Sequence, residues 1–140
     1  MGSRDNRRVI RVHLESPLTV TMGSIGSDVK YNLMTRDISN NGFFLGFEKP
    51  GRFPFTPSSI MEVWMAIGND ETIFFNGKMA RVVYPTDEAA KVTGPGIAIR
   101  IIQIEPQEEQ DLIDFISKKL DEQEQERGVK REEDPSGAAS

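Results

Sequence analysis

Alternation of apolar and polar residues between turn residues is the feature that most limits the fold of this chain. It extends over residues 9–104 and is clear at residues 10–14, where every second side chain is apolar. A period of two is typical of β-strands that bury one face. No apolar run in the sequence approaches the length of a membrane-spanning helix. We therefore expect a mainly β domain built from short antiparallel strands.

Turn residues divide this region into six expected strands. Pro17 predicts a kink or an edge position in the first strand, because proline removes a hydrogen-bond donor from the sheet. The apolar residues of the second strand change parity near Thr35, which a β-bulge would explain. Gly77 predicts a further kink in the fifth strand. The expected strands cover residues 10–22, 29–38, 43–47, 60–67, 72–84 and 97–102.

A helix is predicted over residues 106–120. Proline suits its first turn, and the two glutamates that follow favour the positive end of the helix dipole. An apolar stripe at helical spacing is formed by Leu112, Ile113, Phe115, Ile116 and Leu120. Residues 121–140 are almost entirely charged or polar, so we expect a disordered tail there.

Composition excludes several classes of function. The 140 residues suit one domain. The chain has no cysteine, which excludes disulfides and thiolate chemistry and fits a reducing compartment. His13 is the only histidine, so a catalytic triad or a histidine-rich metal site is not available, and we expect a surface or packing role for it. Because no apolar stretch of a secretory signal follows the N-terminal arginines, we expect a cytoplasmic protein. The shortage of catalytic and metal-binding residue types leads us to expect a non-catalytic protein without a cofactor.

Charge is distributed unevenly along the chain. Residues 1–104 contain 12 Lys and Arg against 10 Asp and Glu, whereas residues 105–140 contain 5 against 12. Four arginines lie within the first eleven residues. Such a density of positive charge favours a partner that carries phosphates, which the C-terminal part would repel.

Arg7 and Arg11 are four residues apart, where the polar N-terminal segment enters the first strand, and Arg8 lies between them. Guanidinium groups supply forked donors for phosphate oxygens, pair bidentately with O6 and N7 of guanine, and stack on planar rings. Taken alone, an arginine cluster is more often a solvated basic arm than a specific site. The arginine cluster therefore indicates a binding site only in combination with a second motif.

Residues 37–42, with the sequence Asp-Ile-Ser-Asn-Asn-Gly, form the other half. Asp37 and Ser39 are two residues apart and therefore project from the same face of a strand end. Asparagine and glycine tolerate positive φ, so residues 40–42 are predicted to turn the chain. A carboxylate can accept hydrogen bonds from N1–H and the amino group of guanine, and Gly42 lets the backbone approach closely. The alternative is a hairpin turn whose Asp and Ser side chains hydrogen-bond local backbone.

Together the two motifs resemble the PilZ family, whose signature is RxxxR followed about 20–30 residues later by [D/N]xSxxG. Residues 7–11 and 37–42 match these motifs. Residues 94–101 look like that family's penultimate, glycine-led strand, and residues 106–120 like its closing helix. The resemblance covers about residues 4–120. It implies a mainly β fold, a six-stranded antiparallel β-barrel with a C-terminal α-helix.

The resemblance also divides the chain and assigns a function. It implies a flexible basic arm at 1–8, the barrel with its helix at 9–120, and the charged tail at 121–140. The protein would be a non-catalytic sensor that binds cyclic di-GMP outside the barrel and changes shape or partner binding when the arm folds over the ligand. The residues implied for ligand binding are Arg7, Arg8, Arg11, Asp37, Ser39, Gly42 and Arg81.

Some features of the implied site stay open. Arg81 is as typical of an ordinary surface arginine as of a ligand contact. Many members of the family have a double arginine before the three-residue gap, and here the first of the pair is Asn6. A second register, Arg4 to Arg8, would place no arginine on the strand, so we prefer Arg7 to Arg11.

The implied partners are cyclic di-GMP and an unidentified downstream protein, with no DNA or RNA and no membrane insertion. Two alternatives stay open. One is a PilZ-like adaptor that acts through protein contacts and binds no nucleotide. The other is a small barrel that binds single-stranded nucleic acid through arginines and aromatic residues such as Phe43, Phe44 and Phe47, although the acidic composition opposes this.

Overall fold

The structure, a computed structural model, describes residues 9–46, 53, 55–68 and 70–138, with side chains described to residue 126. The described residues form six strands and two helices. The strands are β1 (Arg11–Ser24), β2 (Tyr31–Ser39), β3 (Gly42–Gly46), β4 (Met61–Ala66), β5 (Thr72–Val83) and β6 (Gly96–Ile104). The helices are α2 (Ala90–Thr93) and α3 (Pro106–Ala138).

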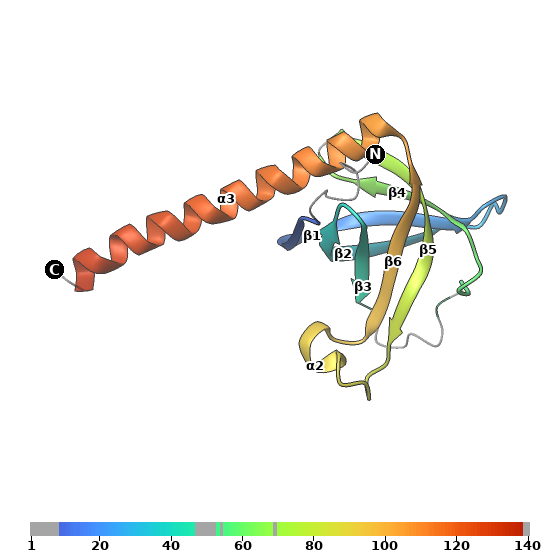
Figure 1. Cartoon of the computed structure of the whole chain (residues 1–140), viewed down its shortest axis with the longest axis horizontal. Coiled ribbons are helices and arrows are strands. Elements are labelled where there is room, and N and C mark those ends of the chain that lie inside the picture. The colour runs from blue at the N-terminus through green and yellow to red at the C-terminus, as the bar shows by residue number, and fades with distance from the viewer. Residues whose placement is uncertain (1–8, 47–52, 54, 69, 139–140) are drawn as a thin grey trace, which may run out of the picture.

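The strands close into a barrel in the order β1-β2-β3-β6-β5-β4, with every pair antiparallel (Figure 1). Closure leaves no strand at an open edge, so each strand has a hydrogen-bonded neighbour on both sides. The prediction of a six-stranded antiparallel barrel with a C-terminal helix is confirmed.

Three of the four register shifts in the strands lie at a proline, a threonine or a glycine. The pairing of β1 with β2 shifts register between His13 and Leu18, the stretch that contains Pro17. The pairing of β2 with β3 shifts between Thr35 and Asp37, which is the predicted bulge. The pairing of β5 with β6 shifts at Gly77 and again between Met79 and Arg81. The predicted kinks are thus register shifts in the barrel wall.

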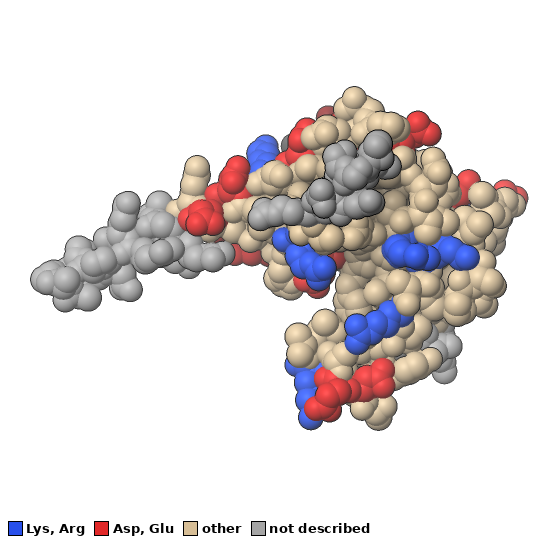
Figure 2. All heavy atoms as spheres, in the orientation of Figure 1, with Lys and Arg blue, Asp and Glu red and all other residues tan. Residues whose placement is uncertain are grey.

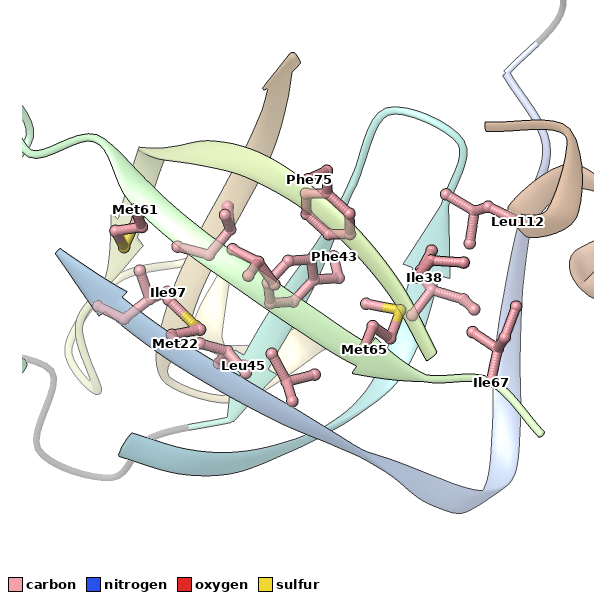
Figure 3. Packing of buried hydrophobic residues seen from close by; sticks show 14 of the residues in the cluster. Met22, Ile38, Phe43, Leu45, Met61, Met65, Ile67, Phe75, Ile97 and Leu112 are labelled. Carbon is pink, nitrogen blue, oxygen red and sulfur yellow. The ribbon is translucent and has the colours of Figure 1, made fainter. Parts of the chain in front are cut away.

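The barrel interior is filled by apolar side chains from all six strands. Figure 3 shows Met22, Phe43 and Phe75 pointing into this interior, where each is at most 5% exposed. Leu112 and Ile116 of α3 are buried in the same cluster. The first turns of α3 therefore close one end of the barrel, and the apolar stripe of the predicted helix packs against the barrel interior.

The C-terminal helix is longer than expected. We predicted that it ends near Leu120 and that a disordered tail follows, whereas α3 continues to Ala138 and projects away from the barrel (Figure 1). Residues 121–126 are all Asp, Glu or Gln, and glutamate and glutamine are good helix formers. Lys119 and Glu122 also pair one turn apart, at 3.5 Å. A helix already nucleated by packing extends through such residues at low cost.

Within the residues that the structure describes, no helix is long and apolar enough to cross a membrane. The same residues contain no group of three or more His, Asp or Glu side chains that could hold a metal ion.

Candidate ligand-binding site

The register of β1 with β2 brings the two sequence motifs together. Arg11 lies directly opposite Ser39, and His13 lies directly opposite Asp37. All four residues face outward, because they alternate with the buried Val12 and Ile38. The predicted site residues Arg11, Asp37 and Ser39 thus share one patch on the outer surface of the barrel.

This patch forms one wall of a groove with a volume of about 660 Å³, within the range of about 300–1,000 Å³ that is usual for small-molecule sites. Gly42 and the half-buried side chain of Phe44 follow on β3, and Ala98 and Arg100 follow on β6. The groove therefore combines charged groups at one end with an apolar surface that suits a planar base.

The short helix α2 contributes to the groove and was missed by the sequence analysis. Val92 and Thr93 of α2 line it, and the Val92 side chain is 87% exposed. The sequence pattern assigned residues 85–93 to no element. A four-residue helix has too few apolar positions to produce a periodic signal, so the sequence offered no means of finding it.

The bulge in β2 decides on which side of the barrel Asp37 lies. Thr35 is 2% exposed and points inward, and without an extra residue Asp37 would share its face. The Thr35 hydroxyl donates to the carbonyl of Phe44 at 2.6 Å and accepts from the amide of Asp37 at 3.3 Å. Thr35 thereby satisfies the backbone of the bulge and turns the Asp37 side chain outward.

The turn between β2 and β3 is held by its own side chains. Ser39 Oγ accepts from the amide of Asn41 at 3.0 Å and donates to the carbonyl of Gly42 at 3.4 Å. The alternative stated for the motif, a serine bonded to local backbone, therefore holds for Ser39. The amide of Ile101 on β6 donates to the carbonyl of Asn41 at 2.8 Å, which ties the turn to the next strand.

Asn40 has a role that the sequence analysis did not find. Its side chain Oδ1 accepts from the amide of Ile10 at 3.0 Å, and its own amide donates to the carbonyl of Ile10 at 3.2 Å. The residue is only 7% exposed. Asn40 thus fixes the chain immediately before Arg11 against the turn that follows Ser39, and so holds the two motifs together.

Gly42 is required by close packing and not by its backbone angles. Positive φ was expected in this turn, but among the described residues only Gly26 and Gly94 have it. A Cβ atom at Gly42 would lie 2.0 Å from the carbonyl oxygen of Ile99 on β6. The close approach expected for this glycine is therefore an approach to the neighbouring strand.

The Asp37 carboxylate is occupied by the only histidine. Nδ1 of His13 lies 2.6 Å from Oδ1 of Asp37, and the two side chains are 68% and 52% exposed. The surface role expected for His13 is thus a contact with a predicted site residue. The sequence analysis expected the Asp37 carboxylate to bind either guanine or local backbone, and its side-chain contact in the structure is with His13.

Several cationic side chains extend from the groove across β6 and β5. Arg100 lies opposite Gly42, Lys78 lies opposite Arg100, and Arg81 lies opposite Ala98. Within the described chain, neither these three nor Arg11 forms an ion pair with a carboxylate. In Figure 2 Lys and Arg side chains lie over this part of the barrel, whereas Asp and Glu lie mostly on α3 and beside α2. The surface beside Asp37 is therefore suited to an anion.

The remaining predicted residues are Arg81, Arg7 and Arg8, of which the structure describes only Arg81. Arg81 lies at its margin, since the neighbouring Ala80 lines the groove and Arg81 does not. Arg7 and Arg8 lie outside the described residues, so their part in the site stays a prediction. Arg100 and Lys78 were not predicted, because only the pairing of β3 with β6 and β5 places them near residues 37–42.

Comparison with known proteins supports one family. The family model described as PilZ domain matches residues 3–118. A search of curated proteins finds no match.

Solved structures share the fold. The Bacillus subtilis inhibitor of motility (MotI/DgrA) superposes with a TM-score of 0.61 at 13% identity, over 82% of this chain and 51% of that one. The PilZ domain of YcgR from Escherichia coli, solved with c-di-GMP, gives 0.58 at 16% identity, over 89% and 98%. YcgR from Escherichia coli in complex with c-di-GMP gives 0.56 at 17% identity, over 89% and 50%. The chain thus spans about half the length of MotI and of the longer YcgR chain.

Proposed function

Because the chain belongs to the PilZ domain family, we propose that it is a non-catalytic receptor for cyclic di-GMP that changes shape or partner binding when it captures the ligand. The observation that carries this proposal is the groove in which Arg11, Asp37 and Ser39 converge. The solved YcgR structures, which contain c-di-GMP, support the choice of ligand.

Recognition of a guanine base is assigned to Asp37. Its carboxylate can accept from both N1–H and the 2-amino group of guanine, a donor pair that adenine does not present. The Phe44 and Ala98 side chains beside it offer an apolar surface for the base. Ser39 and the Gly42 turn shape this end of the groove, since the Ser39 hydroxyl is already engaged with local backbone.

Recognition of the phosphates is assigned to arginines. Arg11 has no carboxylate partner in the described chain, so binding a phosphate would break no ion pair there. Arg7 and Arg8 would complete the set from the arm at residues 1–8, as the family motif implies. We assign Arg81 a peripheral role, because it adds positive charge without lining the groove.

The proposed function also includes a ligand, a partner and a cellular compartment. The ligand is cyclic di-GMP, with no other cofactor, and a downstream protein is the proposed partner. The proposal involves neither DNA or RNA nor membrane insertion, and it places the receptor in the cytoplasm, where a chain without cysteine is well suited.

Titration calorimetry with cyclic di-GMP tests the function, with GMP and cyclic di-AMP as control ligands. Saturable binding of cyclic di-GMP alone is expected. Lys118→Ala serves as a control protein variant, because it removes one positive charge from an exposed side chain that does not line the groove. If the wild-type protein binds nothing at ligand concentrations of hundreds of micromolar, the receptor assignment is wrong.

A PilZ-like adaptor that binds no nucleotide is the second candidate. It is favoured by the length of α3, which projects beyond the barrel (Figure 1). The charged side chains of Asp121, Glu122, Glu124 and Glu126 on this helix are exposed. The adaptor would act through protein contacts alone. Absence of binding in the titration above, together with an intact fold, is the result expected for it.

A further inference from the structure

His13 occupies the carboxylate that the proposed function assigns to guanine. The Nδ1 to Oδ1 distance of 2.6 Å is that of a hydrogen bond between directly opposed residues on β1 and β2. His13 also lines the groove itself. A ligand whose two donors approach both oxygens of Asp37 therefore competes with the imidazole for Oδ1.

The two carboxylate oxygens of Asp37 differ in their hydrogen bonding. Oδ1 is taken by His13, while Oδ2 makes no hydrogen bond with any residue that the structure describes. A guanine edge presents two donors and needs both oxygens. A hypoxanthine edge presents N1–H without the 2-amino group, so it can bind Oδ2 and leave the imidazole in place.

The imidazole can leave without disturbing the barrel. The side chains of His13 and Asp37 are 68% and 52% exposed, so little packing is lost when the ring turns away. The backbone of His13 is held separately, because it pairs with Asp37 in the strand ladder and its carbonyl accepts from Gln123 Nε2 of α3 at 2.9 Å. Only the His13 side chain needs to move.

We propose that His13 sets the affinity and the base selectivity of the groove by competing with guanine for Asp37. The proposal rests on the proposed function and adds a residue outside both sequence motifs. Loss of the imidazole frees Oδ1 and favours ligands with paired donors. Ligands with one donor gain nothing from the loss.

The test compares cyclic di-GMP with cyclic di-inosine monophosphate on wild type, His13→Phe and His13→Gln. Phenylalanine retains a ring on the strand without a hydrogen-bonding group, and glutamine retains a donor for Asp37. His13→Phe is expected to bind cyclic di-GMP about two- to fivefold more tightly, the range for an exposed charge-assisted contact. It should bind the inosine ligand like wild type, and His13→Gln should lie between the two for cyclic di-GMP.

A spectroscopic measurement follows the contact directly. The imidazole nitrogen signals of His13, the only histidine, should shift when wild-type protein is saturated with cyclic di-GMP. They should stay near their free positions with the inosine ligand. Similar thermal unfolding of the three proteins would show that the variants fold.

The outcomes separate the inference from the proposed function. Wild-type binding with an unchanged or weaker His13→Phe variant overturns the role of His13 and leaves the receptor function standing. Equal tightening for both ligands also overturns it, because competition for one oxygen predicts a difference. Binding by His13→Phe alone supports the competition, whereas absence of binding by all three proteins removes both proposals.

Discussion

At the scale of single residues, Arg11 and Asp37 contribute different interactions to the proposed site. Arg11→Ala removes a charge-assisted contact worth about 1.5–3 kcal/mol, so cyclic di-GMP should bind about tenfold or more weakly. The salt dependence of binding should also decrease, because one fewer cation faces the ligand. Calorimetry at two ionic strengths measures both effects, with Lys118→Ala as the control.

Asp37→Ala should change which base is recognised. The lost carboxylate reads N1–H and the amino group of guanine, so discrimination against cyclic di-AMP should fall while the salt dependence changes little. Competition between the two dinucleotides on one protein sample measures this ratio. An Asp37→Ala variant that retains wild-type discrimination would show that another group reads the base.

Gly42 permits a stability test with a matched control. A methyl group at Gly42 would collide with the backbone of Ile99 at 2.0 Å, whereas one at Gly46, on the same strand, meets nothing within 4 Å. Gly42→Ala should lower the free energy of unfolding by about 1–3 kcal/mol or prevent folding. Gly46→Ala should be neutral or slightly stabilising. Urea unfolding of both variants decides whether close packing explains the glycine of the motif.

At the scale of elements, the bulge in β2 links strand geometry to the site. Thr35→Val keeps the shape of the side chain but loses its hydroxyl bonds to Phe44 and Asp37. The variant should be less stable by about 1–3 kcal/mol, because a buried carbonyl loses its partner. It should also bind cyclic di-GMP more weakly, since the bulge orients Asp37. Thr19→Val, at an exposed position of β1, should change neither property.

Helix α3 divides into a packed part and a projecting part. The buried contacts of its described side chains come from Leu112 and Ile116, and Gln123 reaches the carbonyl of His13. Deleting residues 127–140 retains all of these groups. We therefore expect the truncated protein to unfold at nearly the same temperature and to bind cyclic di-GMP with similar affinity, as circular dichroism and calorimetry can measure. Loss of either property would assign a structural role to the projecting part.

At the scale of the whole molecule, the closed barrel should respond to its ligand as one unit. Every strand is paired on both sides. Unfolding of one strand next to the groove therefore breaks hydrogen bonds with both neighbouring strands of the barrel. Cyclic di-GMP at about 100 times its dissociation constant should stabilise the folded protein by about 2.7 kcal/mol. The unfolding temperature should therefore rise with ligand concentration. An equal rise with cyclic di-AMP would indicate charge screening in place of specific binding.

Local patterns in the sequence determined much of the fold. The period of two predicted the strands, the change of parity predicted the bulge at Thr35, and the apolar stripe predicted a helix that buries one face. These features depend on neighbouring residues, because side-chain direction repeats within a few positions. The point at which α3 ends was not predicted, since charged residues suit a solvated helix as well as a tail.

The site was determined in part by the sequence and in part by tertiary structure. The motifs at residues 7–11 and 37–42 predicted a nucleotide site only through their joint resemblance to the PilZ family, since each motif alone is also typical of a solvated arm or a hairpin turn. Only the pairing of the strands places His13 on Asp37, Asn40 against Ile10, and Arg100 beside Gly42. His13 and Asp37 are 24 residues apart in the sequence, and Asn40 and Ile10 are 30 residues apart. Arg100 and Gly42 lie on the paired strands β6 and β3. Local periodicity sets the face on which a side chain lies, but its neighbours across the sheet follow from the register, which is chosen by the packing of the whole core.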